Sequence, residues 1–403
     1  MLHTVNESSN RHIAEYSIAI DIGTTTIAMQ LIELGTMEII DSYTALNSQR
    51  MYGADVIRRI NAANHGKGDQ LQKMVYDDLQ KGIRELLEHQ HILMEQIQKI
   101  AIAGNTTMIH FLRHLSCETL GVYPFTPVML ERIECEEICG LPATILPGIS
   151  TYIGGDIVAG LIACGFDQTE DISLFVDLGT NGEMVIGNRD RILCTSTAAG
   201  PAFEGGNISC GTGGIDGAIC RVRIRDGICE LQTINAQTPV GICGAGLTDA
   251  VSELMRTEMI DNTGLFEDQY FEKGYLLGET ASGKKLYLTQ KDIREFQMAK
   301  AAIRAGIEIL LMRYGVAYDE IKHVWLAGGL GQHMNIENAV WVGLFPKELG
   351  SKIKAVGNTS LQGAALELTE ADAAEREERI ITVAEEFPLS MEDGFNDIYL
   401  QYM

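Results

Sequence analysis

FVDLGTNGEMVIG, residues 175–187, is the stretch that decides the fold. An apolar run reaches Asp177, passes through the small and polar residues 179–182, and becomes apolar again. Apolar runs on both sides of a glycine-containing turn are typical of two strands joined by a hairpin. A carboxylate at the end of a buried strand, directly before such a turn, requires an explanation.

A second stretch, YSIAIDIGTTTIAM at residues 16–29, has the same order of features, with Asp21 in the place of Asp177. Each stretch begins a meander of expected strands, and alternating helical and strand patterns follow each meander. The sequence therefore predicts an α/β protein of two similar halves, as its length also favours. We expect a tail over 1–15, a first domain over 16–170, and a second domain with insertions over 171–403.

The expected helices of the second half include a long one that ends at Gly315. Before it, Thr289-x-x-Asp292 is similar to a capping box, although the box prefers Glu or Gln at the last position. The pattern also predicts a single closing helix over residues 360–378. Its acid-rich part, ELTEADAAEREERI, is typical of a solvated helix face followed by a tail.

The two turns carry groups that bind phosphate. Glycine lets the backbone approach a ligand closely, and turn N–H groups, together with Thr and Asn side chains, donate hydrogen bonds to anions. The carboxylates of Asp21 and Asp177 need a cation between themselves and phosphate, and Mg²⁺ held through water fits that need. Gly-Thr turns are common in ordinary hairpins, but two in the same setting favour a polyphosphate clamp.

A third glycine-rich stretch, VWLAGGLGQHMNIENAV at residues 324–340, lies between an expected strand and an expected helix. Its spacing is not that of the dinucleotide fingerprint. Small residues there would let a flat base lie against the backbone, and close packing of strand on helix is the alternative explanation. It adds a candidate base site to the two phosphate turns.

Composition excludes several classes of function. The net charge of −24 argues against nucleic-acid binding, which needs clustered Lys and Arg. No window of 18 apolar residues predicts a transmembrane helix, and the first residues lack the pattern of a signal peptide. The nine Cys are scattered, without a C-x-x-C pair, which favours reduced thiols and a cytoplasmic protein. Cys135 and Cys139 have the closest spacing, and ordinary packing is favoured over a metal role.

The turn motifs resemble those of a known superfamily. DIGTTT, DLGTNGE and LAGGLG are similar to the first phosphate, second phosphate and adenosine motifs of acetate and sugar kinases, heat-shock chaperones and actin. DLGTNGEMVI, STAAGPAFEGGNISCGTGG and VGICGAGLTDAVSELM are longer, and they resemble the ATPase domain of the reductive activators of corrinoid proteins. This resemblance covers about residues 16–400.

The resemblance implies an actin-like, ribonuclease H-like fold of duplicated βββαβαβα domains with an interdomain nucleotide cleft. It implies an ATPase that uses ATP and Mg²⁺, with Asp21 and Asp177 as the metal-positioning residues, and with Asn105 and Asp156 added to them as catalytic candidates that position water or metal. The candidate nucleotide-binding residues come from both turns, from the AFEGGN segment and from the third glycine-rich stretch. They are Gly23, Thr24, Thr25, Gly179, Thr180, Asn181, Gly182, Glu204, Gly205, Gly328, Gly329 and Gly331.

The expected partners also come from the resemblance. They are a corrinoid protein, whose inactive Co(II) form would be reduced to Co(I), and an iron–sulfur electron donor; a homodimer is compatible with this hypothesis, and neither a nucleic acid nor a membrane is expected. Members of the family typically carry an iron–sulfur domain. Only residues 1–15 precede the first expected strand, so the donor is expected to be a separate protein or domain.

Three alternatives stay open at this point. A small-molecule kinase of the same fold would turn over ATP only with its acceptor. The cluster-bearing activator of a 2-hydroxyacyl-CoA dehydratase would be brown when purified. A nucleotide-dependent assembly protein of the actin kind would pellet with ATP. The sequence also leaves open whether Glu183 is a strand residue beside the clamp or a ligand for metal or water.

Overall fold

Residues 14–403 are described by the computed structural model, and they divide into two units. The first unit contains the chain up to Pro147 and the returning segment Leu361–Ala374. The second unit contains Gly148–Ser360 and Glu375–Met403. Among the described residues, no helix is long and apolar enough to span a membrane.

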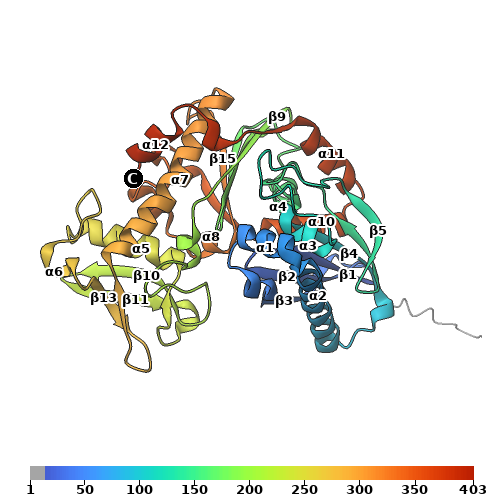
Figure 1. The fold of residues 1–403 in the computed structure, drawn as a ribbon, viewed down its shortest axis with the longest axis horizontal. Helices are drawn as coiled ribbons and strands as arrows, with labels where there is room; N and C mark the ends of the chain where they lie inside the picture. The colour runs from blue at the N-terminus through green and yellow to red at the C-terminus, as the bar shows by residue number, and fades with distance from the viewer. Residues whose placement is uncertain (1–13) are drawn as a thin grey trace, which may run out of the picture. The chain divides into compact units, whose positions relative to one another are not determined.

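A six-stranded sheet forms the centre of the first unit, in the order β3-β2-β1-β4-β6-β5 (Figure 1). The pairs β1/β2, β2/β3 and β5/β6 are antiparallel, and β1/β4 and β4/β6 are parallel. Since a parallel pair needs a crossover connection, helices follow β3 and β4 in the chain. The strands are β1 (Tyr16–Ile22), β2 (Thr26–Glu33), β3 (Glu38–Leu46), β4 (Ile97–Gly104), β5 (Ile133–Ile138) and β6 (Leu141–Ile145).

The long helix α2 packs against this sheet. Its buried residues recur every three or four positions, from Leu71 to Leu87, which places them on one face of the helix. Gly82 lies on that face, and a Cβ there would lie 2.7 Å from Met29 and Tyr43. The helical elements of this unit are η1 (Ser48–Tyr52), α1 (Val56–Ala62), the π-helical turn η2 (Ala63–Lys67), α2 (Gly68–Gln90), η3 (Met94–Gln96) and α3 (Thr106–Leu112).

His110 of α3 is fully buried and held at both ring nitrogens. Val128 donates its backbone N–H to Nε2 at 3.0 Å, so the proton is on Nδ1, which donates to the Thr106 carbonyl at 2.7 Å. Burial lowers the pKa of His110, and the bond to Thr106 opposes this effect in part. His110 is therefore a neutral packing residue of the first unit.

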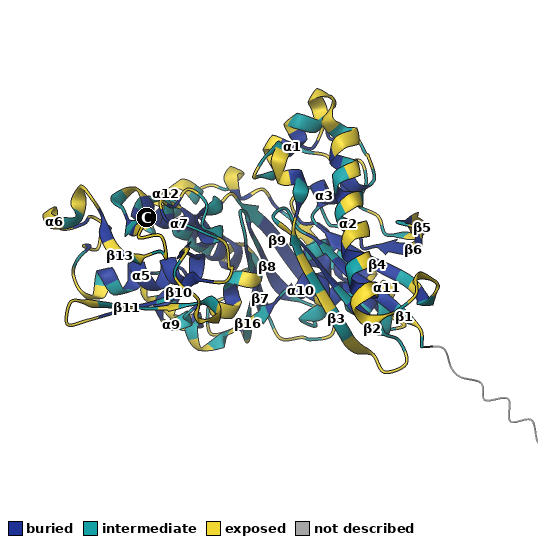
Figure 2. Cartoon of the chain, turned by 90° about the horizontal axis from the view of Figure 1, so that it is seen from below, coloured by how far each residue is buried: buried dark blue, intermediate teal, exposed yellow. Residues whose placement is uncertain are grey.

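The second unit is built around another six-stranded sheet, in the order β16-β15-β7-β8-β9-β17. Figure 2 shows β7 and β8 buried along most of their length. The strands are β7 (Ser173–Leu178), β8 (Gly182–Asn188), β9 (Arg191–Thr197), β15 (His323–Ala327), β16 (Ile353–Gly357) and β17 (Ala384–Glu386). Two smaller sheets contain β10 (Ala218–Arg225), β11 (Ile228–Thr233) and β12 (Gly241–Ile242), and β13 (Tyr275–Glu279) and β14 (Lys285–Leu288).

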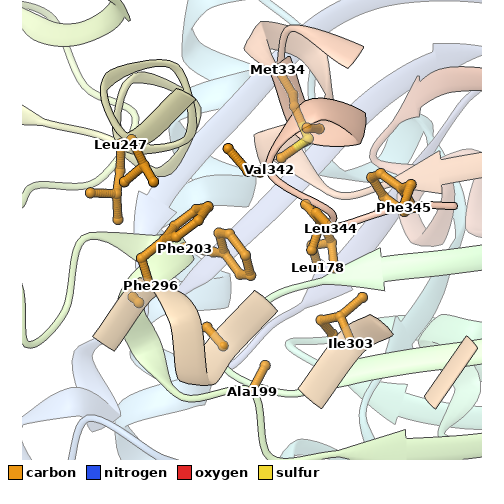
Figure 3. Close-up of a cluster of buried hydrophobic side chains, with 14 of the residues drawn as sticks. Leu178, Ala199, Phe203, Leu247, Phe296, Ile303, Met334, Val342, Leu344 and Phe345 are labelled. Atoms are coloured by element: carbon orange, nitrogen blue, oxygen red, sulfur yellow. The ribbon is translucent and has the colours of Figure 1, made fainter. Parts of the chain in front are cut away.

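Helix α7 is the longest helix of the second unit and packs on β8 and β9. Its capping box is present as predicted, and it ends at Gly315 in the left-handed conformation. Figure 3 shows its residues Phe296 and Ile303 in the apolar core with Phe203 and Leu178. The helical elements of this unit are α4 (Gly155–Ala163), η4 (Pro201–Glu204), η5 (Ile234–Ala236), α5 (Gly244–Arg256), α6 (Asp268–Phe271), α7 (Gln290–Tyr314), α8 (Gly329–His333), α9 (Ile336–Trp341), η6 (Lys347–Lys352), η7 (Leu389–Met391) and α12 (Phe395–Gln401).

The strand orders confirm the predicted duplication. The first five strands of one sheet, β3-β2-β1-β4-β6, match β9-β8-β7-β15-β16 of the other in order and in direction. In both sheets the strand that carries the Asp at its second-last position, Asp21 or Asp177, lies at the centre, between an antiparallel and a parallel neighbour. The predicted domain boundary near residue 170 stays a prediction; the second unit begins at Gly148, and the segment Leu361–Ala374 belongs to the first unit.

The single closing helix predicted over residues 360–378 is wrong. The structure has two helices, α10 (Thr359–Thr369) and α11 (Ala373–Val383), because one buried charged residue of each helix pairs within a different unit. Glu367 of α10 accepts from both terminal nitrogens of Arg132, at 2.9 and 2.6 Å, and from Lys99 at 3.1 Å. Arg376 of α11 donates to both oxygens of Asp167, at 3.0 and 3.1 Å.

The solvated acidic face predicted for this segment is also wrong in part. Glu367 is 8 % exposed and Glu377 is 1 % exposed, so two of its carboxylates are inside the protein. Helical periodicity does not distinguish a charge that faces solvent from one that meets a buried cation from a distant part of the chain.

Candidate functional site

The first turn joins β1 to β2 through Gly23, Thr24 and Thr25. The Gly23 N–H donates to the Thr26 carbonyl at 2.9 Å, and a Cβ on Gly23 would lie 2.8 Å from that same oxygen. A side chain at this position would therefore clash with the backbone that closes the turn. Asp21 lies two residues earlier, opposite Ala28 of β2 and Ala103 of β4.

Two asparagines support the first turn. Asn105 follows β4 directly and caps α3, and its Nδ2 donates to the Thr24 hydroxyl at 3.0 Å. The fully buried Asn47 donates from Nδ2 to the Gly23 carbonyl and from its backbone N–H to the Thr25 carbonyl, both at 2.9 Å. The structure thus brings Asn105 and Thr24 together. Sequence reasoning missed Asn47, which carries no motif; the only available signal was an amide directly after a strand.

The second turn joins β7 to β8. The Gly179 N–H donates to the Asn181 carbonyl, and the Gly200 N–H donates to the Thr180 carbonyl, both at 3.0 Å. The Thr180 hydroxyl donates to the Glu204 carboxylate. The structure therefore joins Glu204, from the AFEGGN segment, to the phosphate-type turn.

Carboxylates gather beside the second turn. Asp177 and Glu183 face each other as a cross-strand pair of β7 and β8. Burial raises the pKa of Glu183 well above its ordinary value, and the nearby charges of Asp177 and Asp156 raise this pKa further. Ser196 of β9 donates to Glu183 at 3.4 Å. Asp156, in the first turn of α4, accepts from the Ile157 N–H at 2.9 Å. Glu183, whose role the sequence left open, thus belongs to an acidic cluster with Asp177 and Asp156.

The third glycine-rich stretch lies at the same sheet edge as Asp177. Ala327, the last residue of β15, is in parallel register with Asp177. Gly328 follows with φ 85° and ψ 161°, and a Cβ there would lie 2.8 Å from the Asp177 Oδ1. Gly331 is buried, where a Cβ would lie 3.1 Å from Leu326, and Gly329 is exposed with open space around it. Gly328 is the member of this stretch whose missing side chain leaves room for Asp177.

Two other predicted glycines have structural reasons of their own. A Cβ on Gly182 would lie 2.0 Å from Ile303 of α7, so this position is small because of core packing. Gly205 has φ 80°, and a Cβ there would lie 2.3 Å from the Thr212 carbonyl oxygen. Gly182 lets α7 approach β8, and Gly205 lets the backbone at Thr212 approach its own. This packing is compatible with a role of both glycines in nucleotide binding and does not require one.

The donor set fits Mg²⁺ bound largely through water. Among residues 14–403, no group of three or more His, Cys, Asp or Glu side chains is arranged to hold a metal ion. Mg²⁺ usually keeps several waters and takes one or two carboxylates together with substrate phosphates. Taken by itself, each unit offers such a carboxylate beside a turn with N–H and hydroxyl donors: Asp21 in the first unit, and Asp177 with Glu183 in the second.

Comparison with known proteins places the chain in a family. Residues 171–403 match the model of the C-terminal domain of RACo, described as its ASKHA domain, and residues 16–169 match the RACo middle region. ASKHA is the superfamily of acetate and sugar kinases, heat-shock proteins and actin, so the predicted actin-like fold is confirmed. The chain belongs to the RACo family, and the predicted resemblance to the corrinoid-protein activators is confirmed with it.

Named relatives agree with this assignment. The chain is 30 % identical to the corrinoid activation enzyme RamQ of Eubacterium limosum, covering 96 % of this chain and 69 % of the relative. It is 26 % identical to the [Co(II) methylated amine-specific corrinoid protein] reductase of Methanosarcina barkeri, covering 96 % and 76 %. A solved reductive activator for corrinoid, iron–sulfur protein superposes with a TM-score of 0.87 at 32 % identity, covering 96 % of this chain and 65 % of that one. The chain thus spans about two thirds of the solved protein's length.

Proposed function

We propose that this protein is an ATP-dependent reductive activator that helps return an inactive Co(II) corrinoid protein to Co(I). The observation that carries the proposal is the second-unit site of a RACo-family chain, where Asp177, the Thr180–Glu204 pair and Gly328 come together at one sheet edge. The activities for which these relatives are named support the corrinoid protein as the substrate.

ATP and Mg²⁺ are the proposed ligands. Mg²⁺ would neutralise the charge of the phosphates and would be held through Asp21 and Asp177. Backbone N–H groups and hydroxyls of the two turns, with Gly23, Thr24 and Thr25 in one and Gly179, Thr180, Asn181 and Gly182 in the other, would bind phosphate oxygens. Glu204 and Gly205 would reach the ribose or phosphates, and Gly328, Gly329 and Gly331 would lie along the adenine.

Asn105 and Asp156 are proposed to position water or metal. Asn105 already holds the Thr24 hydroxyl through Nδ2, so a phosphate bound by Thr24 would lie within reach of this amide. Asp156 is close enough to raise the pKa of Glu183, so it belongs to the charge cluster around Asp177. A bound cation would lower the repulsion within that cluster, and this favours Mg²⁺ binding at the same place.

The redox step is a one-electron reduction of Co(II) to Co(I). The electron is proposed to come from an iron–sulfur protein or domain, and ATP binding or hydrolysis would make the low-potential transfer possible by rearranging the activator or its partner. The proposal includes a cytoplasmic location. It is compatible with a homodimer and does not require one.

The decisive experiment mixes the protein, Mg-ATP, a Co(II) corrinoid protein, an iron–sulfur donor and a low-potential reductant. We expect an ATP-dependent rise of the Co(I) absorption band. Asp177→Ala should abolish ATP hydrolysis and this rise while the protein stays folded, and Asp190→Ala, at an exposed turn of the same sheet, should leave both unchanged. No ATP-dependent Co(I) with several corrinoid partners would refute the proposal, and ATP turnover only with a small-molecule acceptor would favour the kinase alternative.

A further inference from the structure

Asp292, the acidic member of the α7 capping box, makes more hydrogen bonds than a cap requires. It is fully buried. Its Oδ2 accepts from the backbone N–H of Thr289 at 2.7 Å and from the Thr289 hydroxyl at 2.8 Å, and these bonds belong to the cap. Its Oδ1 accepts from the backbone N–H of Ser209 at 2.7 Å and from the Ser209 hydroxyl at 3.0 Å. The bonds to Ser209 tie a distant loop to the start of α7.

The loop that Ser209 belongs to, residues 204–212, is closed on itself through its backbone. A Cβ on Gly211 would lie 2.0 Å from the Gly205 carbonyl oxygen, and a Cβ on Gly205 would lie 2.3 Å from that of Thr212. The Thr212 N–H also donates to the Ile242 carbonyl at 2.9 Å. Backbone packed this closely has little freedom to deform, so a force at Ser209 is transmitted to the rest of the loop.

Helix α7 also contacts Phe203, the residue directly before this loop. Phe296 lies one helical turn after Asp292, and its ring packs edge-on against Phe203 at 5.9 Å between centroids. Figure 3 shows these two rings next to each other in the core. Phe203 and Ser209 are therefore both held by α7, one by apolar contact and one by Asp292, with Glu204 between them in sequence.

Glu204 is where the loop meets the nucleotide site, because its carboxylate accepts from the Thr180 hydroxyl of the second turn. We infer that Asp292 is a positioning residue for nucleotide binding: it holds Ser209 and the 204–212 loop so that Glu204 meets Thr180. This inference rests on the proposed function. Asp292 itself would touch neither nucleotide nor metal.

Three variants separate positioning from helix capping. Asp292→Asn puts an amide N–H where one carboxylate oxygen now accepts, so one pair of donors loses its acceptor. Ser209→Ala removes the hydroxyl bond and keeps the backbone bond. Thr289→Val removes the capping hydroxyl and leaves both Asp292 bonds to Ser209; it also removes a long contact of 3.4 Å between the two hydroxyls. Steady-state ATP hydrolysis, binding of a non-hydrolysable ATP analogue and thermal unfolding are measured for each.

We expect Asp292→Asn to raise the KM for ATP and the Kd of the analogue by about tenfold or more, with a smaller effect on kcat, as for loss of hydrogen bonds to a charged group. Ser209→Ala should raise both constants about threefold. Thr289→Val should lower the melting temperature and change KM by less than about twofold. In a Glu204→Ala background, Asp292→Asn should add little further, because the two residues act in series.

Equal KM effects for Asp292→Asn and Thr289→Val, or full additivity with Glu204→Ala, would show that Asp292 only caps the helix. If Asp292→Asn does not fold, Ser209→Ala alone and in the Glu204→Ala background decides by the same criteria. Absence of analogue binding by the wild-type protein would instead refute the proposed function, so the two failures are distinguishable.

Discussion

Replacing Gly328 by alanine tests the geometry of the second-unit site most directly. Gly328 has φ 85° and ψ 161°, a region of backbone conformation that is essentially restricted to glycine and costs other residues about 1–3 kcal/mol. The new Cβ would also lie 2.8 Å from the Asp177 Oδ1 and 3.4 Å from the Leu178 carbonyl oxygen. The carboxylate of Asp177 therefore has to move, or the end of β15 has to shift away from β7.

The stability effect follows from this strain. For a domain of this size, each kcal/mol corresponds to about 2–4 °C in melting temperature, so Gly328→Ala should melt about 2–12 °C below wild type. ATP turnover should fall further than stability alone predicts, because the displaced group is the proposed metal-positioning carboxylate. Thermal unfolding and ATP hydrolysis, both measured well below the melting temperature, separate the two effects.

Gly329→Ala is the matched control, one residue along the chain. Gly329 is exposed, opens α8, and has no atom within 4 Å of the place where a Cβ would be. Alanine there should be neutral or slightly stabilising, by at most about 1 kcal/mol, so its melting temperature serves as the control for the stability effect of Gly328→Ala. If Gly328→Ala melts with wild type and hydrolyses ATP at the same rate, the argument from close approach to Asp177 is wrong.

Other predictions concern buried titratable groups. Because His110 stays neutral in the fold and its pKa is lowered, unfolding free energy should fall as pH drops below about 6.5, by at most about 1.4 kcal/mol per pH unit, and His110→Gln should flatten this slope in denaturant titrations. Glu183 has a raised pKa, so the free energy of unfolding should fall as the pH rises above about 4.5. Glu183→Gln should therefore be more stable than wild type at pH 8 and not at pH 4. An equal gain at both pH values would contradict the charge argument. Glu367→Gln removes the buried carboxylate charge that the half-buried Arg132 and Lys99 share, and it should cost about 3 kcal/mol in thermal unfolding. Loss of the exposed Glu134 partner of Arg132 should cost less than about 1 kcal/mol.

Much of the fold could be predicted because its signals are local. Apolar runs before glycine-containing turns identified the strands that carry Asp21 and Asp177, and the capping residues Thr289 and Asp292 with the final Gly315 identified α7. Such signals depend on backbone sterics and on which side of one element is buried, and both are encoded within a few residues. The repeat was visible for the same reason, since it is a repeat of local patterns.

Prediction from local sequence patterns was wrong where contacts between residues far apart in sequence determine the structure. The sequence pattern over 360–378 predicts one continuous helix. In the structure, Glu367 and Arg376 bind partners far away in sequence, and the chain turns between these two residues. The buried state of Glu367 could not be predicted either, because a carboxylate on an acidic helix is normally solvated unless a cation from elsewhere meets it.

The sequence alone determined the repeated strand–turn–strand units, the glycines that let their backbones turn, and the carboxylate in front of each turn. Only the tertiary structure decided which groups meet: Asn47 and Asn105 at the first turn, Glu204 at Thr180, and Gly328 at Asp177. The physical reason is range. Turn geometry depends on neighbours in the chain, whereas a hydrogen bond or close contact between residues far apart in sequence exists only after the sheet has set their register and helices such as α7 have packed on it.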